Sequence, residues 1–462
     1  MLAEAATVVS GTADFRLHAF CYHTCYSRLP LACVVLPGPF HPHIWKVGSG
    51  LAHRAAGHCE ADSTETHLPA FRRRTQEELN VLIDGLCMAQ QRHAAGTMSN
   101  KLFENMQMVA GYNANPHGWL ADPEVRTVAP AADICRFDWF HSCLQDGLLN
   151  VEMFQFLKAA DISYAHIEAF LRADWCFPKY TQVKSRQLHT VFKHWRSRSN
   201  ESAQKFKCMA SDLLGVYTLV RHFIQTRWHP TPELELHRDS FMRACAVIDL
   251  MQQVKFGDIP LAQAAAKIRE ALTLAMTAHK AAYGNGHLLP KHHWMFDVAE
   301  QLERSTLLLD NFVVERLHLR VKDLANQVDN LIRWEESVLT SLVTTQMKGR
   351  HQSLKIGLRD PILNSAVPGV RVSQGLQNAL GARIAVGDFV VLHLTHVGQV
   401  EGCAEQRDVL FLVVRVFALV ENVSAQSSQY VPTRLQQVWP ANQVRPAVAW
   451  YADGERLTVL KQ

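Results

Sequence analysis

The chain has 462 residues, of which 48% are apolar and 19% are charged. This composition supplies enough apolar surface for a folded core and excludes global disorder. The net charge of only +4 argues against a histone-like, uniformly basic nucleic-acid binder. The 24 histidines are an unusually large number, and they raise the question of whether some of them share a site.

The sequence contains no recognisable targeting or membrane-spanning segment. The chain does not begin with a basic stretch followed by an apolar one, and no apolar run approaches the ~20 residues that cross a bilayer. The 11 cysteines are odd in number and scattered, which is typical of reduced thiols in a nuclear or cytoplasmic protein. No capped helix or clear strand precedes residue 15, so we expect a truncated N-terminus.

The first part of the chain mixes strand, loop and helix signals. Residues 17–36 carry two β-branched or aromatic bursts and predict two short strands. Residues 37–70 are rich in Pro, Gly, His and Ser and predict a loop. Thr75 followed by Glu78 is a capping-box pattern that predicts the start of helix over 75–110. A turn-rich stretch then separates this helix from the apolar segment ICRFDWFHS.

The middle of the chain is helical in pattern and the end is strand-like. Apolar residues recur at helical period from about residue 150 to 347, and the last of these helices has a 4-3-4-3 apolar stripe. Residues 348–370 are polar, contain two prolines and predict a linker. Residues 371–462 predict a small barrel of about five or six strands. The expected fold class is therefore mixed α/β and dominated by helices.

Two acidic residues stand where they could serve chemistry. Asp138 ends a short apolar segment and precedes a helix, which predicts either a ligand-binding carboxylate at a sheet edge or a helix N-cap. Glu315 shares a predicted helix face with His318 and Lys322. The alternative for Glu315 is a solvated face, since an acid is favourable in the first helical turn.

The histidines and cysteines do not form a convincing zinc site. His292 and His293 are adjacent, so on a helix they point in different directions and make poor joint ligands. Cys21 and Cys25 have a spacing that zinc can use, but Ala56 stands where a second cysteine pair with Cys59 would need sulfur. The chain has no HExxH, phosphate-loop or GxSxG motif. We therefore expect no zinc.

A basic stretch with interleaved aromatic residues runs from Trp175 to Asn200 and contains no acid. Cations beside aromatic rings suit a nucleic-acid backbone and unstacked bases, although a charge run is more often a solvated face. The candidate DNA contacts in this stretch are Lys184, Arg186, Lys193, Arg196 and Arg198.

Several motifs occur in an order that matches one family. They are GYNANPHGWL, CRFDWFHSCLQDGLLNVE, a helical stretch of about 150 residues, PKHHWMFDVAEQL and FVVERLHLRVK. Over residues 45–345 the chain resembles the C-terminal part of CACTA/Plavaka-type DDE transposase-like proteins. In that family a D-x-[ML]-H segment carries the second acid of the triad, and an [FV]-E-[RK] segment carries the last.

The resemblance implies an RNase H-like core interrupted by a helical insertion, with DNA as partner. Asp138 would be the second acid and Glu315 the third, holding Mg²⁺ or Mn²⁺ for two-metal strand cleavage. His141, His292, His293, His318 and Lys322 would support the site. The implied domains are 1–140 for a partial core, 141–290 for the insertion, 291–347 for the last Glu, 348–370 for the linker and 371–462 for the β domain.

The chain also departs from the family pattern. The only N-terminal candidate for the first acid is Asp14, in a context that fits poorly, and an N-terminal DNA-binding domain is missing. The chain is therefore expected to be a transposon-derived protein without catalysis, either monomeric or a homo-oligomer. The alternative is a non-catalytic helical scaffold or interaction module with a C-terminal β domain.

Overall fold

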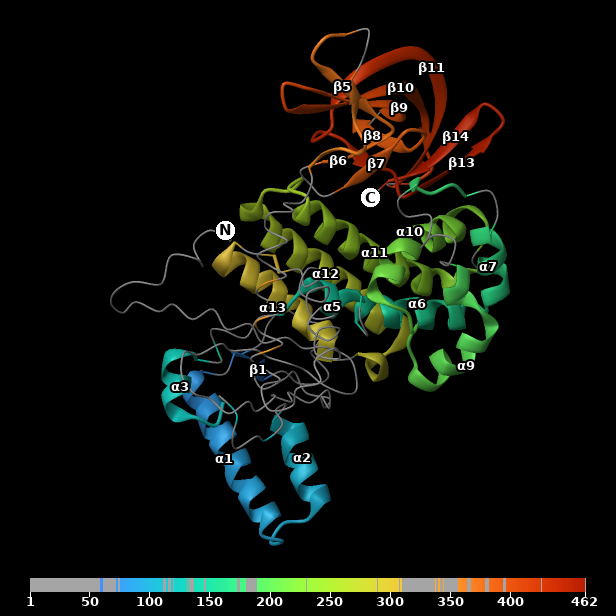
Figure 1. Ribbon diagram of the computed structural model, residues 1–462. Helices are drawn as coiled ribbons and strands as arrows, with labels where there is room; N and C mark the ends of the chain where they lie inside the picture. Colours follow the sequence, from blue (N-terminus) through green and yellow to red (C-terminus); the bar gives the residue numbers. More distant parts are fainter. Residues whose placement is uncertain are drawn as a thin grey trace, which may run out of the picture. The chain divides into compact units, whose positions relative to one another are not determined.

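The computed structural model (Figure 1) forms two compact units, Met1–Asp138 and Trp139–Gln462. It describes residues 59–60, 72–73, 75–110, 114, 118, 120–130, 132, 137–144, 147–172, 175–179, 189–229, 231–288, 290–306, 308–309, 337, 340, 344, 356–363, 367–378, 382–393, 396–424 and 426–461. The strands predicted over 17–36 lie outside these residues. The described residues combine helix with a C-terminal antiparallel sheet, so the mixed, helix-dominated class is confirmed.

The first unit is built on a capped helix. Helix α1, Gln76–Ala94, begins with the predicted capping box, in which the Thr75 side chain accepts from Glu78 N and the Glu78 carboxylate accepts from Thr75 N. The helix ends before Gly96, whose φ of +73° suits glycine. The other elements of this unit are β1 (Cys59–Glu60), β2 (Arg72–Arg73), α2 (Asn100–Ala110) and α3 (Pro123–Val128).

The second unit opens with a helical part. Its α-helices are α5 (Trp139–Leu144), α6 (Leu148–Ala159), α7 (Tyr164–Arg172), α9 (His194–Ala203), α10 (Ala210–Thr226), α11 (Glu235–Lys255), α12 (Leu261–Tyr283) and α13 (Pro290–Ser305). Short 3₁₀ turns are η3 (His189–Phe192), η4 (Pro232–Leu234) and η5 (Asn285–His287). Every residue from Leu148 to Leu157 is buried. Helix α6 is therefore central, and it packs against α5 and α11.

The β part follows within the same unit. Its strands are β3 (Gly357–Leu358), β4 (Ile362–Leu363), β5 (Val370–Ser373), β6 (Gly375–Gln377), β7 (Arg383–Ala385), β8 (Phe389–His393), β9 (His396–Gln406), β10 (Val409–Asn422), β11 (Ser427–Pro440), β12 (Arg445–Pro446), β13 (Ala449–Asp453) and β14 (Arg456–Leu460). The first two of them, β3 and β4, lie inside the stretch 348–370, for which a linker is predicted.

The strands form an antiparallel sheet with the order β12-β8-β9-β10-β11-β14-β13, in which β5 also pairs with β9 and β4 pairs with β5, and a second sheet β3-β6-β7. The end strands β12 and β13 are not paired with each other among the described strands, so the predicted barrel is an open sheet. Close packing fixes the centre of this sheet, because a Cβ added at Gly398 would lie 2.8 Å from Val414 Cβ and 3.1 Å from Leu392 Cδ1.

Contacts between the helical part and the β part, here called the junction, join them into one unit. Cys176 and Trp450 exchange two backbone hydrogen bonds, of 2.7 and 2.9 Å. Lys179 N donates to Asp388 Oδ1 at 2.8 Å, and the side chains of His222 and Ser427 are hydrogen-bonded at 2.9 Å. Further contacts are an ion pair of Arg445 with Asp258 and an edge-on packing of Trp175 against Tyr451.

Within the described part of the chain, no helix combines the length and the apolar character that crossing a membrane requires.

Candidate functional site

Asp138 stands directly before α5 and is only 7% exposed. This is the position that the helix N-cap interpretation predicts. Residues 133–136, over which a strand was expected, lie outside the described residues. Helix α5 is buried along its whole length, His141 included, and the His141 ring lies edge-on to Phe140 at 5.7 Å between centroids.

The segment after Asp138 packs against helix α13. Cys143 Sγ lies 3.5 Å from Met295 Sδ, although the two residues are 152 positions apart. Trp139 N donates to Leu309 O at 3.3 Å. Helix α5, which begins in the FDWFH motif, is therefore in contact with the helix of the PKHHW motif, and Trp139 of FDWFH also contacts the chain that follows this helix.

His292 and His293, the histidines of that motif, are both fully buried on α13. They have different neighbours, because adjacent helical residues point in different directions. His292 lies 5.4 Å from the His279 ring, and His293 lies 6.2 Å from the Phe296 ring. Burial, together with the nearby His279, holds the pKa of His292 well below its usual value, so its neutral form is favoured.

Only some of the other predicted site residues are among those that the structure describes. Glu315, His318 and Lys322 lie outside the described residues, as do Lys184 and Arg186. Lys193 precedes α9 and is half-buried, whereas Arg198 is exposed on that helix. Arg196 also belongs to α9. Of the basic stretch, Arg198 is thus placed where a phosphate could reach it.

A polar cluster lies between α6 and α12 in the core. It was not predicted from the sequence. His279 Nδ1 lies 2.5 Å from Glu152 Oε2, and both side chains are fully buried. The Tyr283 ring lies 4.9 Å from the His279 ring, and burial, followed by the Glu152 charge, raises the pKa of Tyr283. A glutamate inside the predominantly apolar run LLNVEMFQFL was the available signal, because an acidic side chain enters a core only with a partner.

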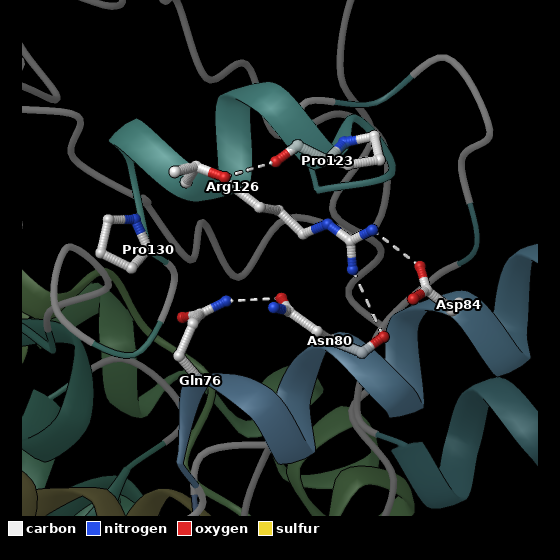
Figure 2. Close-up of a pocket in the computed structure, with 7 residues that line it drawn as sticks. Gln76, Asn80, Asp84, Pro123, Arg126 and Pro130 are labelled. Carbon is white, nitrogen blue, oxygen red and sulfur yellow. Dashed lines mark hydrogen bonds and ion pairs between the residues drawn. The ribbon is translucent and has the colours of Figure 1, made fainter.

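The first unit contains a hollow of about 350 Å³ between α1 and α3 (Figure 2). It is lined by Gln76, Asn80, Asp84, Pro123, Arg126, Thr127 and Pro130. The Arg126 side chain is 6% exposed; its Nη2 donates to Asp84 Oδ1 at 2.7 Å and its Nη1 to Asn80 O at 3.3 Å. Helix α3 lies in a stretch predicted as turns. Its signal was Asp122 as N-cap followed by Pro123 in the first turn.

Searches against protein-family models, curated proteins and solved structures found no match. Among the described residues, no three His, Cys, Asp or Glu side chains form a group that could hold a metal ion.

Proposed function

We propose that the chain is a transposon-derived, DDE transposase-like protein that binds DNA and has lost strand cleavage. The observation that carries the proposal is the packing of α5, which begins in the FDWFH segment, against α13, together with the hydrogen bond of Trp139 with Leu309. In the family that the chain resembles, these segments belong to one site. The family resemblance requires these segments to lie close together in space. Because they are far apart in the sequence, their contact is not a consequence of chain connectivity.

The proposal includes a weakened metal site. Carboxylate oxygens are the ligands that Mg²⁺ and Mn²⁺ prefer, so Asp138 and Glu315 are the residues that would hold such an ion. When bound, the ions would activate the attacking oxygen and stabilise the leaving oxygen of a phosphodiester. Two acids without a fitting third supply less charge and fewer ligands, which is the reason to propose that cleavage has been lost.

DNA binding is tested by titrating labelled duplex DNA with the full chain at several salt concentrations. We expect binding that weakens as salt rises, because phosphate contacts release counterions. Arg198→Gln should lower the slope of log K against log[salt] by about 1. Arg243→Gln, which removes an equal charge from an exposed ion pair with Asp239 on α11, is the matched control. Absence of binding at low salt would refute the proposal.

Loss of cleavage is tested by incubating supercoiled DNA with Mg²⁺ or Mn²⁺. We expect no nicking by the wild-type chain. Nicking that disappears in Asp138→Ala would support the site and contradict the loss of catalysis. Nicking that survives this substitution would show that Asp138 has been wrongly assigned.

A second candidate is a non-catalytic scaffold that presents its β part as an interaction module. The junction favours it, because backbone bonds at Cys176 and side-chain bonds at His222 and Asp388 hold the β part against the helices. A rigid module suits presentation of a binding surface. The two candidates are distinguished by the DNA titration, since a protein scaffold needs no salt-dependent affinity for DNA.

A further inference from the structure

The hollow in the first unit is lined by polar faces of two helices. Gln76, Asn80 and Asp84 are four residues apart on α1 and therefore share one face, while Leu79, Ile83 and Leu86 are buried on another. Arg126 and Thr127 face them from α3, whose start is fixed by the Asp122 cap. In Figure 2, Gln76, Asn80 and Asp84 extend from α1 and Arg126 extends from α3 into the space between the two helices.

The orientation of the Asn80 amide follows from a chain of hydrogen bonds. Ala132 N–H donates to Gln76 Oε1 at 2.9 Å, which leaves the Gln76 amide nitrogen as the end that faces Asn80. Gln76 Nε2 then donates to Asn80 Oδ1 at 2.7 Å. Within the described part of the chain Asn80 Nδ2 has no other partner. The hollow therefore presents a fixed N–H donor at this position.

Arg126 orients the second polar group. Its guanidinium holds Asp84 Oδ1, so Asp84 Oδ2 remains as an acceptor on a carboxylate that is 55% exposed. The two charges cancel each other, so the site has no net attraction for an anion or a cation. A ligand that fits must be neutral and must offer both an N–H donor and a C=O acceptor.

We propose that this hollow binds one unpaired guanine base. Guanine presents N–H donors beside a carbonyl on one edge, which matches the Asp84 acceptor and the Asn80 donor, and that edge is free only when the base is unpaired. A volume of about 350 Å³ is at the lower end of small-ligand sites and suits one base with its sugar. The site lies in the first unit and requires neither Asp138 nor Glu315.

Calorimetric titration of the full chain with guanosine, 1-methylguanosine and adenosine tests the proposal. We expect guanosine to bind at least ~10-fold more tightly than the other two. 1-Methylguanosine lacks the N1–H that donates to Asp84, and adenosine lacks both this N–H and the carbonyl that accepts from Asn80. A short adenine strand with one central guanine, compared with a strand of adenine alone, shows whether the base is taken from a nucleic-acid chain or only as a free nucleoside, because adenine has no carbonyl for the Asn80 donor.

Variants locate the binding in the hollow. Asn80→Leu should weaken guanosine at least ~5-fold while leaving the Arg126–Asp84 pair intact. Gln76→Leu should narrow the ratio of guanosine to adenosine affinity, because the Asn80 amide can then turn. Glu124→Gln changes an exposed residue of α3 that does not line the hollow, and it should leave the affinity for guanosine unchanged. No guanosine binding, equal affinity for all three nucleosides, or unchanged binding by Asn80→Leu would each overturn the proposal. DNA binding by the second unit could still persist.

Discussion

At the scale of single residues, the Glu152–His279 pair is a buried polar contact inside the helical core. It joins α6 to α12, and both side chains are fully buried. A buried pair contributes little net stability relative to apolar residues of similar size, but removal of one partner leaves the other uncompensated. The pair therefore constrains which substitutions the core tolerates.

We expect His279→Leu to lower the free energy of unfolding by about 1–3 kcal/mol, because it leaves the buried Glu152 side chain without its hydrogen-bond partner. The double variant Glu152→Leu/His279→Leu should recover most of that loss, since neither polar group of the pair is then left buried and unpaired. Urea unfolding followed by circular dichroism measures both. Additive losses in the double variant would show that the two side chains are not energetically coupled.

The burial of His222 at the junction predicts that the free energy of unfolding depends on pH. Burial, followed by the nearby Arg227 charge, lowers the pKa of His222 to about 4. The folded state thus binds fewer protons than the unfolded state. The contribution of the neutral His222 to the free energy of unfolding is complete above pH ~6.5 and is lost as the pH falls toward 4. The loss is about 1.36 kcal/mol per pH unit, or about 3 kcal/mol in total.

His222→Gln should therefore flatten the decline in unfolding free energy between pH 6.5 and 4. The control is His229→Gln, which changes an exposed histidine shortly after the end of α10. It should leave the decline in unfolding free energy between pH 6.5 and 4 unchanged. The measurement is urea unfolding at several pH values. Identical profiles for wild type and His222→Gln would contradict the assignment.

At the scale of secondary structure, Gly398 on β9 predicts a sharp local constraint. An added methyl group there would come within 2.8 Å of Val414 Cβ on β10, whereas at Gly402 on the same strand the nearest atom is 3.8 Å away. Gly398→Ala should cost about 1–3 kcal/mol through overpacking, and Gly402→Ala should cost much less. Thermal unfolding compares the two, and equal shifts in Tm would argue against close packing at Gly398.

Strand β11 has one free edge among the described residues, because β14 pairs only with Ser427–Tyr430. Pro432 and Pro440 stand along this edge, and between them the register with β10 shifts opposite Val416. Prolines and bulges both hinder a further strand from pairing. This edge is therefore protected against aggregation, although Leu435 and Val438 are exposed on it.

The secondary structure was predictable where local chemistry decides it. The capping box of Thr75 and Glu78 indicated the start of α1, and helical periodicity indicated the region that contains α6 to α13. Helix α3 was missed because Gly118 and the neighbouring prolines suggested turns. The contact of His279 with Glu152 depends on residues 127 positions apart, and no local pattern encodes such a distance.

At the scale of the whole molecule, the junction leads us to expect that the helical part and the β part unfold together. Trp175 contacts Phe170, His222 and Tyr451, so it links α7, α10 and β13. Trp175→Ala should weaken the junction and split one calorimetric unfolding transition of the second unit into two. A single transition with only a lower Tm would show that the remaining junction contacts suffice for cooperativity.

The junction also has a consequence for how the chain is made. His222 meets Ser427, which follows it by 205 positions, and Lys179 meets Asp388, which follows by 209. At a ribosome that adds ~5–20 residues per second, the helical part waits some ten seconds or more for its partner strands to emerge. During that time the side chains of Trp175 and His222 lack their β-part contacts, and a chaperone that holds nascent chains would find them accessible.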